Sequence, residues 1–516
     1  MWGLYYALVL FFNLFIFPIY MLELPGANVG LSIVLAIAIA IPIYFVYSSL
    51  GSTMPRSGGD YLFQSRGIYP VVGLIVTFGW ILLGLGWEAF SSTPYLSLTT
   101  EALGPYFQVV GAETSNTGLI NLGTTLSGLN GTVVLGIILM ILAFILYLGG
   151  MRWIVKIQRY VLLPAIAITA IVIPVIYLSA GSSVIANFNS VSQLLSGNAN
   201  SFSVIMKGAT ANGFTPSPFS WSDTIIMAFI LGSTSLGGAV FGNPLLGEVK
   251  GGGHFKNLTL AYLFAGLVTA LGFLLPELYF FINSYGTTFT QAAAYASLVG
   301  VNGTAVNLPI TYGYMTLAAT TSIPLQTLFL VGYIAVGFLF PLILCVAVAR
   351  YNMAASIDGL LPLWFSSINQ RLRRPVNAMI LPIILTIVAL YIEAQSISGS
   401  LLLISLGTWV TFVVEGGTGL AALLFPIRQK FLVKASPVAK YPWVMQIAGA
   451  LVLILTLIEA YWYFTVPSLA LSLGTIGYGL LLATAIVSII VFVVMIGLRK
   501  RQGIDVMLAF KEVPPE

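Results

Sequence analysis

A seven-residue segment inside an apolar run is the part of the sequence best suited to contact a small polar molecule. It spans residues 232–238, and its glycines and hydroxyl side chains are Gly232, Ser233, Thr234, Ser235, Gly237 and Gly238. A helix interrupted here would present free N–H groups and a positive dipole end to an anion, and free carbonyl groups to a cation. In an apolar surrounding such backbone is tolerated only beside a cavity. The alternative is that these small residues only let helices pack closely.

Two acidic residues lie deep in apolar runs and could exchange a proton. Glu88 lies two-thirds along one run, and Glu415 lies near the middle of another. A charge at such a position is costly, and ionisable residues there often mark a proton pathway. The alternative is a protonated, hydrogen-bonded carboxyl group in the protein core. Three other acids lie nearer the ends of their runs, where we expect them at the membrane interface: Glu277, Glu393 and Glu459.

The composition indicates what kind of chain positions these residues. Of its 516 residues, 59% are apolar and 7% are charged, whereas soluble domains have about 45–50% and about 25%. This composition excludes a soluble enzyme and a disordered chain. The single cysteine, Cys345, cannot form an internal disulfide, and the single histidine, His254, leaves no basis for a metal site or a haem. We therefore expect a multi-pass membrane protein that is not an enzyme and needs no cofactor.

Several runs are long enough to cross a bilayer, which takes about 20 apolar residues. The predicted spans are 3–22, 28–50, 70–97, 131–149, 158–180, 223–246, 257–282, 324–349, 376–395, 400–425, 443–465 and 472–498. The sequence therefore predicts an all-α integral membrane protein with 12 transmembrane helices. We expect loops in the three long polar stretches 98–130, 181–222 and 283–323, with low complexity at 189–203.

Basic residues fall on one side of this arrangement. Nineteen of the twenty Lys and Arg residues lie in segments that the twelve spans place together, and Lys207 lies on the other side. Because basic loops remain in the cytoplasm, we expect the N and C termini to be cytoplasmic and the protein to lie in the plasma membrane. The net charge of +5 then reflects orientation in the bilayer. No basic–aromatic groove indicates nucleic-acid binding.

Four short motifs occur in order at the ends of predicted spans. They are Pro55-Arg56-Ser57-Gly58-Gly59-Asp60-Tyr61, Gly149-Gly150-Met151-Arg152, Gly247-Glu248-Val249-Lys250, and Arg350 followed by Asp358-Gly359-Leu360-Leu361-Pro362. They resemble elements of the amino acid permeases of the amino acid–polyamine–organocation superfamily. In that family, similar elements follow the second helix, precede the fifth, and follow the sixth and the eighth. The resemblance covers nearly the whole chain.

This resemblance implies a five-plus-five inverted repeat with broken first and sixth helices. Residues 1–180 would form the first repeat, 223–425 the inverted second repeat, 443–498 two further helices and 499–516 a cytoplasmic tail. The substrate would bind between the broken helices, at 232–238 and in the first span. The first-span candidates, where the family usually has Gly-Ser-Gly, are Asn13, Leu14, Phe15 and Pro18.

The resemblance also implies a secondary active transporter that imports an amino acid by alternating access, with protons and the lipid bilayer as its other partners. The superfamily can bind sodium through hydroxyls of the eighth helix, but this span has one Ser or Thr, Thr327. A hard cation needs several oxygen ligands, so we expect proton symport through Glu88 or Glu415. The lysine that some proton-coupled relatives carry in the fifth helix is missing. An exchanger without ion coupling and a passive channel remain alternatives.

Overall fold

The computed structural model describes residues 24–81, 98–248, 251–299, 310–372, 375–395, 397–434, 436, 438–466 and 474–511. Every regular element in these ranges is a helix, which confirms the all-α class. The apolar helices are α2 (Val29–Thr53), α4 (Pro70–Ile81), α8 (Leu129–Gly149), α10 (Leu163–Ala180), α13 (Trp221–Ile230), η4 (Leu231–Leu236), η5 (Gly237–Glu248), α14 (Phe255–Thr269), η6 (Ala270–Leu274), α15 (Leu275–Tyr285), α18 (Ile323–Ile357), α19 (Asn377–Gln395), α20 (Ile397–Arg428), α22 (Pro442–Thr465) and α24 (Gly474–Arg501). The shorter elements are α3 (Gly59–Gly67), η1 (Leu98–Leu103), α6 (Gly104–Glu113), α7 (Thr117–Ser127), α9 (Met151–Ile157), η2 (Gln158–Leu162), η3 (Gly181–Ser183), α11 (Val184–Ser196), α12 (Ser201–Ala211), α16 (Thr287–Val299), α17 (Tyr312–Ala318), η7 (Leu363–Ser366), α21 (Lys430–Lys434) and η8 (Val506–Lys511).

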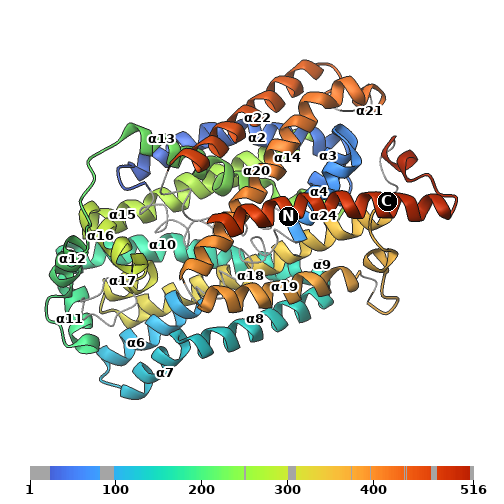
Figure 1. The fold of residues 1–516 in the computed structure, drawn as a ribbon. Coiled ribbons are helices and arrows are strands. Elements are labelled where there is room, and N and C mark those ends of the chain that lie inside the picture. Colours follow the sequence, from blue (N-terminus) through green and yellow to red (C-terminus); the bar gives the residue numbers. More distant parts are fainter. Residues whose placement is uncertain are drawn as a thin grey trace.

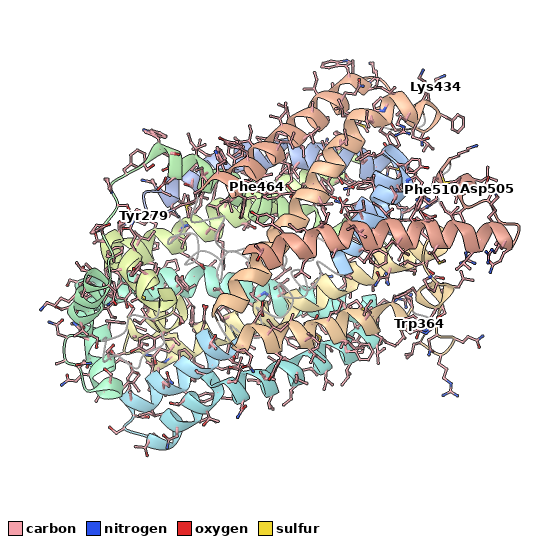
Figure 2. The ribbon with its side chains drawn as sticks, in the orientation of Figure 1. Tyr279, Trp364, Lys434, Phe464, Asp505 and Phe510 are labelled. Atoms are coloured by element: carbon pink, nitrogen blue, oxygen red, sulfur yellow. The ribbon has the colours of Figure 1, made fainter. Side chains whose placement is uncertain are left out.

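The long helices run side by side, and the short ones gather at two opposite ends of the bundle (Figure 1). Helices α3, α9 and α21 lie at one end, which we call the basic end because it carries Arg66, Lys156 and Lys434. Helices α11, α12, α16 and α17 lie at the opposite end, and Lys207 is in α12. Figure 2 shows Lys434 and Phe510 together at the basic end, with Tyr279 toward the other.

Helix α8 shows how the outer helices divide between protein and bilayer. Its exposed residues include Val134, Ile138 and Ile145, which recur at helical spacing and form one apolar face. Its buried residues include the smaller Gly136 and Ala143. A wide apolar face of this kind is unstable in water and fits a lipid surrounding.

Among the described residues, eight helices are long and apolar enough to cross a membrane. They coincide with eight of the predicted spans, namely 28–50, 131–149, 158–180, 223–246, 257–282, 376–395, 443–465 and 472–498. Two more predicted spans, 324–349 and 400–425, lie within α18 and α20. The span 3–22 and most of 70–97 lie outside the described residues. The count of twelve and the repeat boundaries therefore stay predictions.

The prediction of loops in the long polar stretches is wrong, because these stretches contain helices at the opposite end. Helix α11 covers most of the low-complexity stretch and buries Val184, Phe188 and Val191 on one face. Aromatic packing fixes α16 against the start of α12, since the rings of Phe202 and Phe289 stack at 3.9 Å between centroids. Polar residues dominate the composition here, but the few apolar ones recur at helical spacing.

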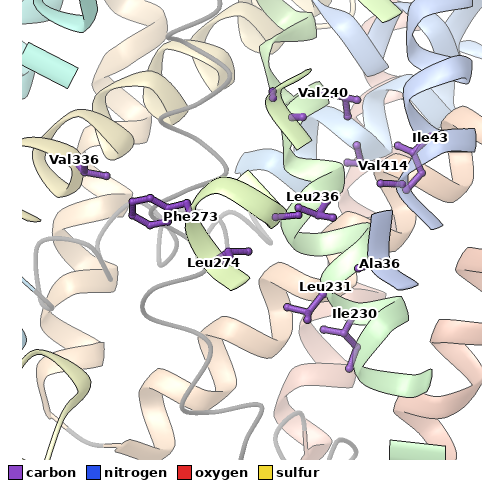
Figure 3. Close-up of a cluster of buried hydrophobic side chains, with 14 of the residues drawn as sticks. Ala36, Ile43, Ile230, Leu231, Leu236, Val240, Phe273, Leu274, Val336 and Val414 are labelled. Carbon is purple, nitrogen blue, oxygen red and sulfur yellow. The ribbon is translucent and has the colours of Figure 1, made fainter. Parts of the chain in front are cut away.

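The interior of the bundle is built around α2 and the sixth predicted span. Figure 3 shows Ala36 and Ile43 of α2 facing Leu231, Leu236 and Val240. All five residues are at most 5% exposed. The side chain of Asn28 caps α2 by accepting a hydrogen bond from the Leu31 N–H at 3.0 Å. The buried contacts with α2 hold the sixth predicted span in the interior of the protein, where a substrate site is expected.

Candidate functional site

The sixth span changes its helix type in the segment 232–238. Helix α13 begins at a side-chain cap from Ser220, and its regular α-helical pattern ends at Ile230. The next turns, η4, are π-helical and end with a hydrogen bond from the Gly237 N–H to the Gly232 carbonyl. The chain then continues as the 3-10 helix η5. It remains helical instead of opening into extended backbone, yet π-helical turns are rare and often occur at functional sites.

Two buried acidic side chains from other helices meet this segment. Ser233 Oγ donates a hydrogen bond to Glu459 Oε1 of α22 at 2.7 Å. On α20, Glu415 Oε1 lies 2.6 Å from the position that a Cβ on Gly237 would occupy. Both glutamates are at most 2% exposed, and Glu415 Oε1 has no hydrogen-bond partner among the described residues. We call Ser233, Gly237, Glu415 and Glu459 the acidic cluster.

Close packing of α20 on α22 places the two acids against the same segment. A Cβ on Gly416 would lie 3.0 Å from Thr456 Cγ2, so the two backbones approach as small residues allow. Glu415 directly precedes Gly416, and Glu459 lies one turn after Thr456. Because Gly416 lets α20 and α22 approach closely, the neighbouring residues Glu415 and Glu459 both reach the π-helical turns.

Helix α2 covers another side of the segment. The Tyr44 hydroxyl donates to the Leu236 carbonyl at 2.7 Å, which satisfies a backbone acceptor in the irregular turns. A Cβ on Gly232 would lie 2.7 Å from Ile39 Cβ. Close helix packing is therefore one reason for a glycine at 232, and its contact with substrate stays a prediction.

Sequence reasoning missed Glu459. The structure buries Glu277, Glu393 and Glu459 against other parts of the protein, with exposures of 1%, 3% and 2%. Their position near the membrane interface stays a prediction. The signal for Glu459 was its spacing. Thr456, Glu459 and Tyr463 recur at intervals of three and four residues and form part of the buried face of α22.

Of the remaining predicted site residues, the structure places only Gly238, which is buried in η5. The side chains of Thr234 and Ser235 lie outside the described part of the structure, as do the whole residues Asn13, Leu14, Phe15, Pro18 and Glu88. The described structure therefore joins Ser233, Gly237 and Glu415 in one cluster and says nothing of the first span.

A second polar cluster lies at the basic end and contains the Pro55–Tyr61 motif. Arg66 of α3 and Asp358, which follows α18, form a buried bidentate ion pair, with N–O distances of 2.5 and 2.9 Å. Tyr61 donates a hydrogen bond to the same carboxylate at 2.6 Å. Burial alone would lower the pKa of Arg66, but the hydrogen bonds and charge of Asp358 outweigh it and raise that pKa above its usual value. The pair therefore links α3 to the end of α18.

Asp60 extends this cluster to α20. Its carboxylate accepts hydrogen bonds from Tyr351 at 2.6 Å and from Thr418 at 2.9 Å. Burial raises the pKa of Asp60, and these hydrogen bonds partly offset the rise. We call Asp60, Tyr61, Arg66, Tyr351 and Asp358 the basic-end cluster.

The paired glycines of the motif attach it to the end of the sixth span. Gly58 and Gly59 have φ values of +120° and +40°, a region that residues with a Cβ rarely adopt. The Gly58 N–H donates to the Pro244 carbonyl at 3.0 Å. A Cβ on Gly59 would lie 2.9 Å from Pro244 N. The glycines thus allow direct backbone contact with η5 at Pro244. Pro244 lies seven residues after Gly237 of the acidic cluster.

The C-terminal helix η8 covers the basic-end cluster. The Phe510 ring lies 4.8 Å from the Arg66 guanidinium carbon, and the Ala509 carbonyl accepts a hydrogen bond from Arg66 at 3.4 Å. Phe510 is 5% exposed. The tail therefore helps to exclude water from the ion pair.

A family comparison agrees with these features. The family model described as amino acid permease matches residues 5–495, a range that includes both the acidic cluster and the basic-end cluster. Among the curated proteins, none matches the sequence. The match covers nearly the whole chain and confirms the resemblance carried by the four motifs. The chain belongs to the amino acid permease family of the amino acid–polyamine–organocation superfamily.

Proposed function

We propose that this permease is a secondary active transporter that imports an amino acid together with protons by alternating access. The family supports an amino acid as the substrate. The observation that carries the proton coupling is the acidic cluster, in which Glu415 and Glu459 meet the irregular turns of the sixth span. A carboxyl group beside a substrate site can take up a proton when that site faces one side and release it when the site faces the other.

The irregular turns would also bind the substrate. The π-helical and 3-10 turns at 231–238 would contact the carboxylate and the ammonium group of an amino acid, together with the first span. We propose Asn13, Leu14, Phe15 and Pro18 as the first-span contacts. Glu88 stays a second candidate for proton coupling.

The proposed topology places the basic end in the cytoplasm of a cell whose plasma membrane holds the protein. It rests on the positive-inside rule and on the position of α3, α9 and α21 at one end (Figure 1). In the same proposal residues 1–180 and 223–425 are inverted repeats, and the basic-end cluster closes the cytoplasmic side of the transport path. Its opening would release the substrate inward.

Sodium is a weaker candidate for the coupling ion. The Thr327 hydroxyl donates to the Ile323 carbonyl at 2.8 Å and lies 2.9 Å from the Tyr106 hydroxyl. It is therefore already engaged near the start of α18. A sodium site would need several more oxygen ligands.

The test is uptake of radiolabelled amino acids by the purified protein in proteoliposomes. We expect accumulation under an inward proton gradient and none under a sodium gradient at equal pH. In Glu415→Gln and Glu459→Gln proteins, proton-driven accumulation should fall at least about tenfold, while exchange of internal for external substrate continues. A wild-type protein that exchanges substrate but never accumulates it would show an exchanger, and the coupling proposal would be wrong.

The orientation has its own test. In a Cys345→Ala background, a Ser57→Cys protein should resist an impermeant thiol reagent added to intact cells and react after permeabilisation. Lys207→Cys, exposed in α12 at the opposite end, is the matched position and should react in intact cells. The reverse pattern would place the basic end outside the cell.

A further inference from the structure

A cavity of about 590 Å³ lies at the basic end, away from the acidic cluster. Its walls come from the end of α8, from α9, from the end of η5 and from α18. The residues that matter for its chemistry are Arg152, Trp153, Lys156, Glu248 and Arg350. None of them belongs to either cluster described above.

Arg350 supplies the main sign that this cavity binds an anion. Its Nε donates to Glu248 Oε1 at 2.5 Å, and the Tyr147 hydroxyl is a second polar neighbour of the guanidinium group. Its Nη1 is buried and has no partner in hydrogen-bond geometry among the described residues. The residue is 6% exposed. A buried N–H group without an acceptor is costly and rare, so a ligand that brings an oxygen atom would complete the site.

The other charges of the cavity add to this preference. Arg152 and Lys156 lie one turn apart on α9 and therefore share a face. The Lys156 ammonium lies 5.6 Å from the centre of the Trp153 ring, which holds it beside the cavity. Among the described residues that line the cavity, Glu248 is the only acid, and it is already paired with Arg350. The cavity therefore keeps a net positive charge.

The surroundings favour a lipid as the source of the anion. Trp153 and Ile368, both on the cavity wall, are 57% and 61% exposed. Tryptophan beside cations is typical of the depth at which phospholipid headgroups lie. Basic pockets between helices on the cytoplasmic side bind anionic headgroups. We propose that this cavity binds the phosphate of an anionic phospholipid, with Arg350 Nη1, Arg152 and Lys156 as donors and the acyl chains lying against Trp153 and Ile368.

Thermal unfolding of the purified protein in detergent can test this site without measuring transport. A ligand that binds the folded state raises the unfolding midpoint. We expect dioctanoyl phosphatidylglycerol to raise the midpoint, and dioctanoyl phosphatidylcholine and inorganic phosphate at equal concentration to leave it unchanged. In an Arg152→Gln/Lys156→Gln protein, the same rise should require at least about tenfold more lipid.

A matched control separates the site from surface charge. Lys430→Gln/Lys434→Gln removes two exposed cations from α21 at the same end and should leave the lipid response unchanged. Met353→Phe narrows the cavity without changing charge and should also weaken the response. If it does not fold, the two double variants decide. The proposal is wrong if both double variants respond alike, if the zwitterionic lipid acts equally, or if inorganic phosphate alone gives the full rise.

Discussion

An Arg66→Met protein should be less stable than the unchanged protein by about 3–5 kcal/mol, the usual cost of removing one partner of a buried ion pair. The substitution leaves Asp358, which is 6% exposed, with a buried charge and only the Tyr61 hydroxyl from the cluster to stabilise it. The loss should appear as a lower thermal unfolding midpoint of the purified protein in detergent, and as less folded protein in the membrane.

Two further proteins show whether the ion pair itself is responsible. Arg501→Met removes an exposed arginine at the same end and should change the midpoint little, since exposed charges contribute at most about 1 kcal/mol. Arg66→Met/Asp358→Asn should recover part of the loss, because no buried charge is left without its partner. Equal midpoints for Arg66→Met and Arg501→Met would contradict the buried ion pair.

A Gly237→Ala protein should lose proton-driven uptake by about tenfold or more while still reaching the membrane in folded form. The added methyl group would lie 2.6 Å from Glu415 Oε1, and ordinary contact begins at 3.4 Å. The carboxyl group therefore has to move by about 0.8 Å, and displacements of this size in an aligned site can cost about a hundredfold in rate. This expectation rests on the proposed role of the acidic cluster. Initial uptake rates in proteoliposomes under a proton gradient measure it.

The control is Gly479→Ala in α24, where nothing lies within 4 Å of the new methyl group. It should transport normally, because glycine to alanine inside a helix is otherwise favourable. Unchanged uptake by Gly237→Ala, with normal amounts of folded protein, would remove Glu415 from the proposed coupling.

The long apolar helices that the structure describes were predictable because each one is a local property of the sequence. A bilayer demands long apolar runs, and the runs around α8 and α22 are visible without any tertiary information. The helices at the opposite end are different. Residues 189–203 have only a few apolar side chains among Ser, Asn and Gln, and the helix that covers much of this stretch packs through Phe188 and Val191. Tertiary packing therefore stabilises this helix, and a short stretch of sequence does not show that packing.

The candidate site was predictable in part for the same reason. Glycines and hydroxyls concentrated at 232–238 disturb a helix locally, and the structure changes its helix type there. Glu459 was missed because its importance comes from Ser233, which is 226 residues away in the chain. The ion pair of Arg66 with Asp358 joins residues 292 apart. Contacts at such separations leave no pattern in one sequence.

The π-helical segments also bear on how the length of this chain can change during evolution. Each residue of an α-helix turns it by about 100°, so inserting or deleting one residue in a span normally rotates everything beyond it onto the wrong face. A π-helical turn holds an extra residue, and its loss would leave an ordinary α-helical turn. Single-residue insertions and deletions among relatives should therefore gather at Leu98–Leu103, Gln158–Leu162, Leu231–Leu236 and Ala270–Leu274. Elsewhere in the spans they should be rare.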